Sequence, residues 1–243
     1  MSSIVQNAAP LARPGQRWFW LAGALFAALV VFVGFSPTFY LKSLFGTPQL
    51  STLKLVHGTV FSAWIALFVA QTWLVAANRR AVHRRLGAFG ALLLAAMCVV
   101  GFQVAIESGR SGFTPDPAKV SALSFMAVPL FDLGVFALLV LAALLLRARS
   151  DWHKRLMLVA TLSLLPPALA RVALQFPPLP VLPIAFGGTA LVIVAAMVLD
   201  SVTLRRLHPA MMWGGMIVIL SLPGRLLISS TRAWQDLAAW LIA

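Results

Sequence analysis

Charged residues are scarce in this sequence: they make up 10% of its 243 residues, whereas about a quarter of an ordinary soluble domain is charged. Hydrophobic residues reach 61% of the chain. Together these two values exclude a soluble globular enzyme and a disordered protein. Cysteine is also nearly absent. Because Cys98 is the only one, the sequence excludes an internal disulfide and a zinc or iron–sulfur site built from cysteines.

The apolar residues are concentrated in long stretches that contain few or no charges. A membrane-spanning helix needs about 20 apolar residues, and seven stretches are close to this length or longer. They cover residues 18–41, 55–78, 86–106, 120–146, 156–170, 172–199 and 207–224. The fifth stretch is long enough to span a membrane only if Arg171, which follows it, lies at an interface. The sequence therefore predicts an all-α, polytopic integral membrane protein with seven transmembrane helices.

Two short segments flank this seven-helix domain, which we assign to residues 18–228. Residues 1–17 are predicted to form a cytoplasmic lead. Residues 229–243 are predicted to form a helix that lies on the outer surface of the membrane. Large apolar side chains recur there at helical spacing, namely Trp234, Leu237, Trp240 and Leu241.

The basic residues predict the orientation of the chain. Twelve of the nineteen Lys and Arg residues lie in the N-terminal segment or near the connections after the second, fourth and sixth predicted helices. The other seven lie near the connections after the first, third and fifth predicted helices or toward the C-terminal end. Cytoplasmic loops are enriched in Lys and Arg, so the richer set is predicted to face the cytoplasm and the N-terminus to lie inside. The net charge of +13 then reflects residues that orient helices and contact anionic lipid headgroups, and no nucleic-acid partner is expected.

Three of the predicted helices begin alike on this cytoplasmic side. Residues 83–86 read His-Arg-Arg-Leu and residues 153–156 read His-Lys-Arg-Leu, while residues 205–208 carry the rearranged version Arg-Arg-Leu-His. The similarity predicts a repeat of helix pairs, formed by spans 2 and 3, 4 and 5, and 6 and 7, after a single first helix.

Polar and ionisable side chains inside the spans are costly, and they mark candidate functional sites. The half of the molecule predicted to face outward contains a set of candidate ligand-binding residues: Tyr40, His57, Trp64, Asp132, Arg171 and Arg225. Because this set contains two arginines and a single carboxylate, it would suit an anionic headgroup or a ligand that carries a carboxylate. The alternative is purely structural, with Asp132 paired to Arg171 or Arg225.

One face of the second predicted helix is aromatic in the middle and polar at both ends. It comprises His57, Phe61, Trp64, Phe68 and Gln71, which fall at helical spacing. This stripe has two interpretations. It either lines a pocket for a flat or elongated apolar ligand, or it is a packed face of the core whose histidine bonds to a neighbouring helix.

Three histidines lie at one predicted depth on the cytoplasmic side: His83, His153 and His208. Histidines on neighbouring helices can ligate haem iron axially, and three of them can hold zinc or copper. The alternative is that these residues simply occupy the headgroup zone beside the arginines.

Several short runs resemble a group of uncharacterised seven-helix bacterial inner-membrane proteins. The runs are residues 37–41 (Pro-Thr-Phe-Tyr-Leu), 57–58 (His-Gly), 83–87 (His-Arg-Arg-Leu-Gly), 153–157 (His-Lys-Arg-Leu-Met) and 208–209 (His-Pro). The resemblance extends from Trp18 onward and implies a multi-pass protein of the bacterial inner membrane, without implying an activity. A weaker resemblance, carried by histidines beside helix ends, is to haem A synthase and membrane haem b proteins, and it implies haem b as a candidate cofactor.

The sequence contains no catalytic motif, which favours a binding function over an enzymatic one. The leading hypothesis is a protein that binds a small hydrophobic or anionic amphiphilic ligand in a pocket open to the outer side. One alternative is a haem b-binding electron carrier or assembly factor of the respiratory membrane. Another is a structural subunit of a membrane complex.

Overall fold

The computed structural model describes residues 14–114 and 120–243, so residues 1–13 of the predicted lead lie outside the described residues. The described residues form α-helices and two short π-helices, with no strand among them. In chain order the elements are α1 (Pro14–Phe35), η1 (Ser36–Tyr40), α2 (Thr52–Ala76), α3 (Arg80–Arg110), α4 (Ala122–Leu145), α5 (Ser150–Leu162), α6 (Pro166–Gln175), η2 (Pro183–Gly187), α7 (Gly188–Leu204), α8 (Pro209–Ser229) and α9 (Arg232–Ile242).

Seven helical stretches among the described residues are long and apolar enough to cross a membrane, which confirms the predicted all-helical architecture and the predicted number of candidate spans. Four of them are single helices, namely α2, α3, α4 and α8. The other three combine neighbouring elements: Trp18–Tyr40 joins α1 to η1, Ser150–Gln175 joins α5 to α6, and Pro183–Leu204 joins η2 to α7.

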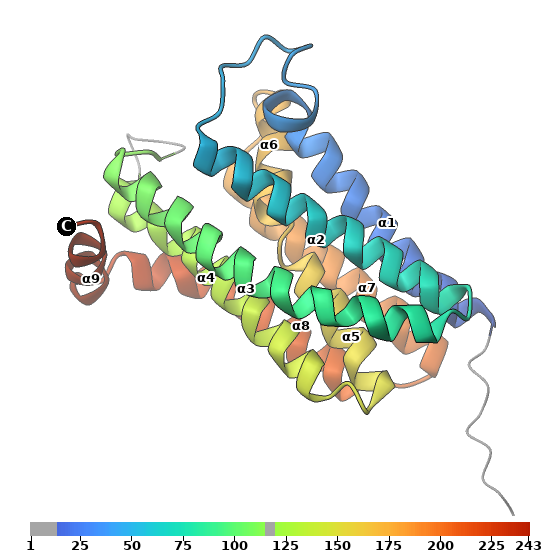
Figure 1. Cartoon of the computed structure of the whole chain (residues 1–243). Helices are drawn as coiled ribbons and strands as arrows, with labels where there is room; N and C mark the ends of the chain where they lie inside the picture. Colours follow the sequence, from blue (N-terminus) through green and yellow to red (C-terminus); the bar gives the residue numbers. More distant parts are fainter. Residues whose placement is uncertain (1–13, 115–119) are drawn as a thin grey trace, which may run out of the picture.

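The helices pack as a bundle in which successive helices are neighbours (Figure 1). The chain runs from α1 to α2, α3, α4 and α5, and each of these helices packs against the next. The α4 helix also packs against α8, and α1 packs against α6. The span formed by α5 and α6 lies at the centre. In its most apolar stretch 61% of the residues are buried, against 22–33% in the other six spans.

The central span is broken where two prolines follow each other. The α5 helix ends at Leu162, and α6 begins with Pro166 and Pro167 in its first turn. Proline has no backbone N–H and clashes with the preceding turn of a helix, but it suits a first turn because the N–H groups there are unpaired anyway. The break makes α6 a separate short helix, and this helix positions Arg171.

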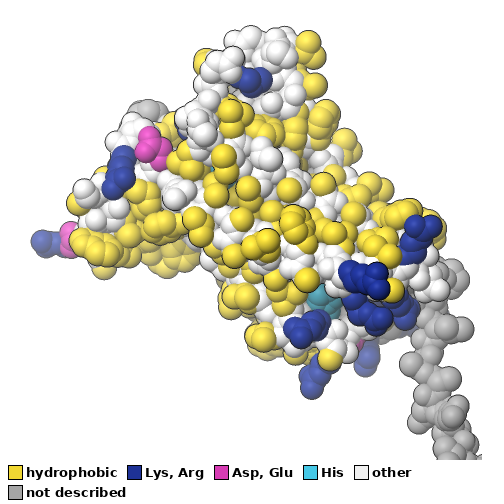
Figure 2. All heavy atoms as spheres, in the orientation of Figure 1, with side chains coloured by type: hydrophobic (Ala, Val, Ile, Leu, Met, Phe, Trp, Pro, Cys, Tyr) yellow, Lys and Arg dark blue, Asp and Glu magenta, His cyan; other side chains and the backbone are white. Residues whose placement is uncertain are grey.

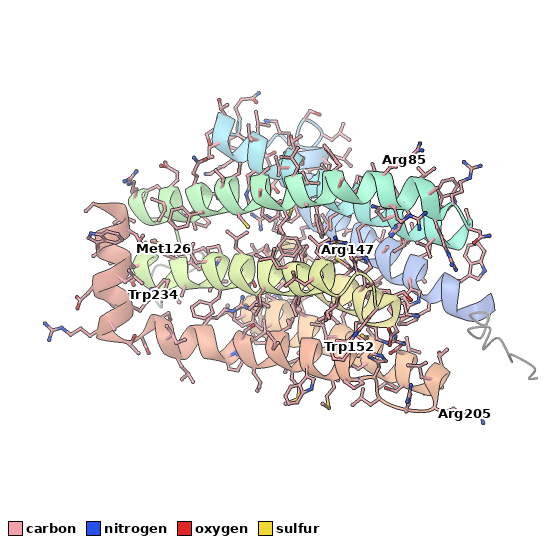
Figure 3. The ribbon with its side chains drawn as sticks, turned by 60° about the horizontal axis from the view of Figure 1, so that its bottom comes forward. Arg85, Met126, Arg147, Trp152, Arg205 and Trp234 are labelled. Atoms are coloured by element: carbon pink, nitrogen blue, oxygen red, sulfur yellow. The ribbon has the colours of Figure 1, made fainter. Side chains whose placement is uncertain are left out.

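The last helix lies across one end of the bundle, as Figures 1 and 3 show. Thr231 caps α9 by accepting a hydrogen bond from the backbone N–H of Trp234 (3.3 Å). The Trp234 side chain is buried and donates from Nε1 to the carbonyl of Leu123 (2.8 Å), whereas Trp240 is 72% exposed. The helix therefore has one face packed on α3 and α4 and another face that is open.

Basic side chains gather at the opposite end of the bundle. Figure 2 shows Lys and Arg concentrated there and hydrophobic side chains across the middle, and Figure 3 places Arg85, Arg147 and Arg205 at this end. We name it the basic end and define it by the connections 77–79, 146–149 and 205–208. We name the other end, which carries α9, the α9 end.

Candidate functional site

The six residues predicted to form one ligand pocket make their contacts in three separate groups. Asp132 and Arg225 pair between α4 and α8. Tyr40, His57 and Arg171 belong to the part of the α9 end built from η1, α2 and α6. Trp64 lies in the core of the bundle. The six residues therefore divide into an ion pair, a group of three residues that includes Arg171, and one core residue.

Asp132 and Arg225 form a buried ion pair. Arg225 donates from Nη1 to Oδ1 of Asp132, and the two residues are 1% and 6% exposed. Arg225 also donates from Nε to the carbonyl of Ser221 (3.1 Å) and from Nη2 to its hydroxyl (3.0 Å), while Phe186 lies beside the guanidinium. The partner of Asp132 is thus Arg225 and not Arg171. Because these contacts occupy Arg225, it is poorly placed to bind a ligand.

Arg171 has no carboxylate partner among the described residues. It donates from Nη1 to the carbonyl of Pro167 in its own helix (3.0 Å). Its guanidinium carbon lies 4.3 Å from the ring centroid of Phe35 in α1, a distance typical of a cation–π contact. The aromatic ring shields one face of the guanidinium, and donors at its edge other than Nη1 have no acceptor in the part of the chain that the structure describes.

His57 lies within electrostatic range of the charge of Arg171. The ring stacks on Phe61, with centroids 4.1 Å apart. Its Nδ1 atom is buried and has no hydrogen-bond partner. A buried polar atom without a partner is uncommon in folded proteins, so His57 and Arg171 together form a polar site that is only partly satisfied.

Tyr40 and Trp64 have structural partners of their own. The Tyr40 hydroxyl is 2.7 Å from the hydroxyl of Ser62, and its ring stacks on Phe32. Trp64 is 2% exposed and donates from Nε1 to the hydroxyl of Thr161 in α5 (3.3 Å). Trp64 therefore ties α2 to the central span and does not reach a ligand.

The middle and the two ends of the α2 stripe differ in their surroundings. In the middle Trp64 and Phe68 are buried in the core, as expected for a packed face. At the two ends His57 Nδ1 and Gln71 Oε1 are buried without partners. The stripe thus separates two under-satisfied polar regions, one toward the α9 end and one toward the basic end.

A second buried ion pair was not anticipated from the sequence. Arg155 in α5 and Asp200 in α7 are each 1% exposed and share two hydrogen bonds, Nε to Oδ2 at 2.7 Å and Nη2 to Oδ1 at 2.8 Å. A signal was present in the sequence, because Asp200 falls four and seven residues after the buried Ala196 and Ile193, and hence on the inner face of α7.

The three histidines of the basic end are arranged as a pair and a single residue. The rings of His83 and His153 lie 6.4 Å apart. His208 packs against Trp152, and both its ring nitrogens are engaged: Nε2 is 3.0 Å from a carboxylate oxygen of Asp151, and Nδ1 accepts the N–H of Ala210 (3.1 Å). His208 therefore caps α8 and does not join the other two.

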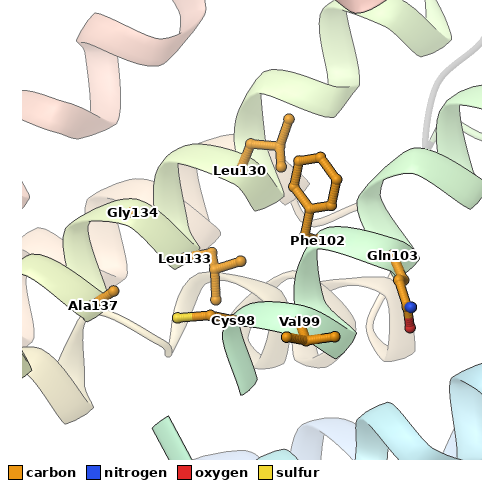
Figure 4. Close-up of a pocket in the computed structure, with 8 residues that line it drawn as sticks. All are labelled: Cys98, Val99, Phe102, Gln103, Leu130, Leu133, Gly134 and Ala137. Carbon is orange, nitrogen blue, oxygen red and sulfur yellow. The ribbon is translucent and has the colours of Figure 1, made fainter. Parts of the chain in front are cut away.

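The α3–α4 surface carries a shallow groove that none of the predicted site residues lines. Its volume is about 680 Å³, and its lining is apolar except for Gln103 and the thiol of Cys98 (Figure 4). Both helices are membrane-spanning in length and composition, so in a bilayer lipid chains would cover this groove.

Comparisons of the chain with protein-family models, with curated proteins and with solved structures found no match.

Proposed function

We propose that the protein binds an anionic amphiphile at the α9 end, with the headgroup on Arg171 and His57. The observation that carries the proposal is the contrast of Arg171 with Arg155 and Arg225, the other two arginines that are not exposed among residues 18–114 and 120–243. Arg155 and Arg225 each pair with an aspartate, whereas Arg171 has no carboxylate partner among the described residues. A guanidinium that is withdrawn from water favours an anionic partner, and a carboxylate or phosphate fits its planar set of donors.

The surroundings of Arg171 suit the rest of such a ligand. Phe35 covers one face of the guanidinium, and His57 offers a second polar group through its unpartnered Nδ1. Apolar side chains nearby on α1 and after α6 are exposed, with Phe32 at 46% and Phe176 at 60%. An apolar chain attached to the headgroup would lie over these side chains and so remain in apolar surroundings while the headgroup binds Arg171.

A comparison of oleate with its methyl ester tests this proposal. The two probes share one chain and differ in charge, so oleate alone is expected to stabilise the protein purified in a neutral detergent. At a probe concentration about 100 times the Kd, the stabilisation of about 2.7 kcal/mol should raise Tm by roughly 5–10 °C. Thermal unfolding measures the shift.

The Arg171→Met variant provides the decisive comparison. It should lose the shift with oleate and keep its own Tm, because Arg171 has no carboxylate partner among the described residues. Arg232→Met is the matched control at the same end, since this arginine is 95% exposed and should leave the shift unchanged. An equal response of wild type and Arg171→Met to oleate, or an equal response to oleate and methyl oleate, would overturn the proposal.

We also propose that the basic end faces the cytoplasm of a bacterial cell, with the protein in the inner membrane. Twelve of the nineteen Lys and Arg residues belong to the set that would then be inside, and the exposed Arg85 and Arg147 lie at this end. In this orientation Arg171 and His57 belong to the outer half of the molecule. The related proposal of a helix-pair repeat is supported by α3, α5 and α8, which all begin at the basic end.

Reporter fusions test the orientation. After Ala243, only a reporter that functions in the periplasm is expected to be active. In the connection 77–79, only a reporter that functions in the cytoplasm is expected to be active. Alkaline phosphatase and green fluorescent protein, which function on opposite sides of the membrane, measure the two outcomes at each position. The reverse pattern at both positions would place the Arg171 site on the cytoplasmic side.

A further inference from the structure

The shallow groove of the α3–α4 surface, which we call the α3–α4 groove, contains one amide side chain. Gln103 lines the groove and is exposed, whereas the rest of the lining is apolar except for the thiol of Cys98 (Figure 4). Gln103 belongs to the uncharged stretch 86–106 and lies about one helical turn before its end. In a bilayer its amide therefore faces lipid chains, which neither donate nor accept hydrogen bonds.

Gln103 differs from other glutamines of the protein in its hydrogen bonding. Gln71, Gln175 and Gln235 each donate from the side chain to a backbone carbonyl of the chain. Gln103 has no hydrogen-bond partner among the described residues, and its exposed position leaves both ends of the amide open. An amide without a partner is costly in hydrocarbon, so Gln103 favours a second polar group supplied by another molecule in the membrane.

Gly134 lines the same groove from α4, and its own chain does not explain the missing side chain. A Cβ atom at Gly134 would meet no atom within 4 Å, whereas a Cβ atom at Gly101 or Gly214 would lie 3.2 Å from a leucine side chain. Glycine weakens a helix relative to alanine, so its use at an open position calls for a reason. In membrane proteins, small residues on the surface of a helix allow a second helix to approach closely.

We propose that a second copy of this chain packs on the α3–α4 groove and forms a two-fold symmetric dimer in the membrane. Two chains inserted in the same direction are related by an axis along the membrane normal, so each residue has its counterpart at the same depth. The amide of Gln103 can both donate and accept, and the two copies of this residue therefore satisfy each other. The dimer does not depend on the function proposed for Arg171.

The lining of the groove suits a copy of this chain better than a lipid chain. A lipid chain would cover the apolar part, formed by Phe102, Leu130 and Leu133, but it would leave the Gln103 amide unpaired. The ridge of α3 beside the groove is apolar and exposed, with Val99 at 58% and Phe102 at 43%, and it can enter the groove of the other copy. Hydrophobic contact alone does not favour a helix over lipid, so the paired amides and the close approach at the glycine decide.

The charge of the chain is also compatible with a dimer at this surface. The protein has a net charge of +13, which would oppose the contact of two copies through the basic end. The α3–α4 groove contains no charged side chain, so two identical surfaces meet there without repulsion between like charges.

Energy transfer between labelled chains in liposomes measures the dimer. Arg147→Cys combined with Cys98→Ala places the only thiol at the exposed basic end, where it takes a donor or an acceptor dye. Energy transfer should fall as added lipid dilutes the two labelled forms, and the fall gives the Kd of the dimer. If the protein remains monomeric at every lipid ratio, lipid chains fill the groove and the proposal is wrong.

Two substitutions in the groove test the interface. Gln103→Leu should raise the Kd about 3- to 30-fold, because hydrogen bonds between membrane helices contribute modestly. Gly134→Leu should raise it roughly tenfold to 100-fold, since the new side chain occupies the space needed by the second helix. Gly187→Leu is the matched control: a Cβ atom there also meets no atom within 4 Å, but this residue ends η2, so the Kd should not change. A Gly134→Leu protein that dimerises like the wild type would contradict the proposal.

The native Cys98 gives a second, independent measurement. Because it lines the groove, a short membrane-permeant bifunctional maleimide should join two wild-type chains in liposomes, and Gly134→Leu should abolish the product. The control is Leu191→Cys combined with Cys98→Ala, since residue 191 is 69% exposed on α7 and lies outside the groove. Equal crosslinking through positions 98 and 191 would show random collisions in the membrane and would overturn the proposed dimer.

Discussion

Replacing Arg155 with alanine is expected to lower the free energy of unfolding by about 3–5 kcal/mol, because Asp200 would remain buried without its partner. Arg155 makes more contacts than this pair. It donates from Nη1 to the carbonyl of Asp151 (2.8 Å), and its guanidinium lies over the ring of Trp20. The single cysteine provides the measurement, since Cys98 is partly buried and a thiol-reactive dye would report its exposure as the protein unfolds in detergent.

A lysine at position 155 separates the effect of geometry from that of charge. Arg155→Lys keeps the charge but cannot make the two parallel hydrogen bonds to Asp200, so most of the loss should remain. Arg85→Lys is the matched control at the same end; its side chain is exposed, and the change should stay within about 0.5 kcal/mol. The double replacement Arg155→Met with Asp200→Leu should recover part of the stability. A fully stable Arg155→Lys would show that the paired hydrogen bonds contribute little.

The second large effect is expected for the pair of Asp132 and Arg225, and it should be asymmetric. Asp132→Leu leaves a buried guanidinium that cannot lose its charge, so a loss of about 3–5 kcal/mol is expected. Arg225→Met leaves a carboxyl group that can become neutral by binding a proton, so the loss should be smaller, about 1–3 kcal/mol. Unfolding in detergent measures both values.

A double-mutant cycle tests whether the two residues act together. Asp132→Leu combined with Arg225→Met should be more stable than the sum of the single losses predicts, with a coupling of roughly 0.5–3 kcal/mol. The same cycle with Arg171→Met is the control, and it should be additive because Arg171 does not contact Asp132. If Asp132 were additive with both arginines, it would act as a neutral hydrogen-bond donor and the ion-pair account would fail.

The two buried pairs explain how helices with apolar surfaces find fixed partners in a lipid environment. Lipid chains are as apolar as leucine, so hydrophobic contact alone does not favour one helix neighbour over another. A buried charge, in contrast, is satisfied by only one partner. Asp132 and Arg225 join α4 to α8, and Arg155 and Asp200 join α5 to α7.

Much of the architecture could be predicted from residue type and spacing. The number of spans follows from the distance between charges, because hydrocarbon excludes charged side chains and sets a minimum helix length. The break before α6 follows from Pro166 and Pro167, since proline cannot continue a helix. The shared face of Trp64 and Phe68 follows from their spacing on α2, and the structure shows that this face is buried in the core.

The candidate sites were only partly predictable. The sequence showed that Asp132 needs a cation, but two arginines lie in the same half of the molecule and spacing cannot choose between them. The structure joins Asp132 to Arg225 and leaves Arg171 without a carboxylate partner among the described residues. It likewise pairs His83 with His153 and gives His208 a capping role that resemblance among the three helix starts did not reveal.

The sequence by itself determined that this protein is helical and that seven of its stretches are long and apolar enough to span a membrane. These properties depend on residues near one another in the chain, through helix length, proline breaks and the exclusion of charge from lipid. Only the tertiary structure decided which polar groups meet, as it did for Arg155 and Asp200, which are 45 positions apart in the chain. The physical reason is that hydropathy sets the length of a helix but not its neighbours or its rotation about its own axis. Those are set by packing and by the need to satisfy each buried charge.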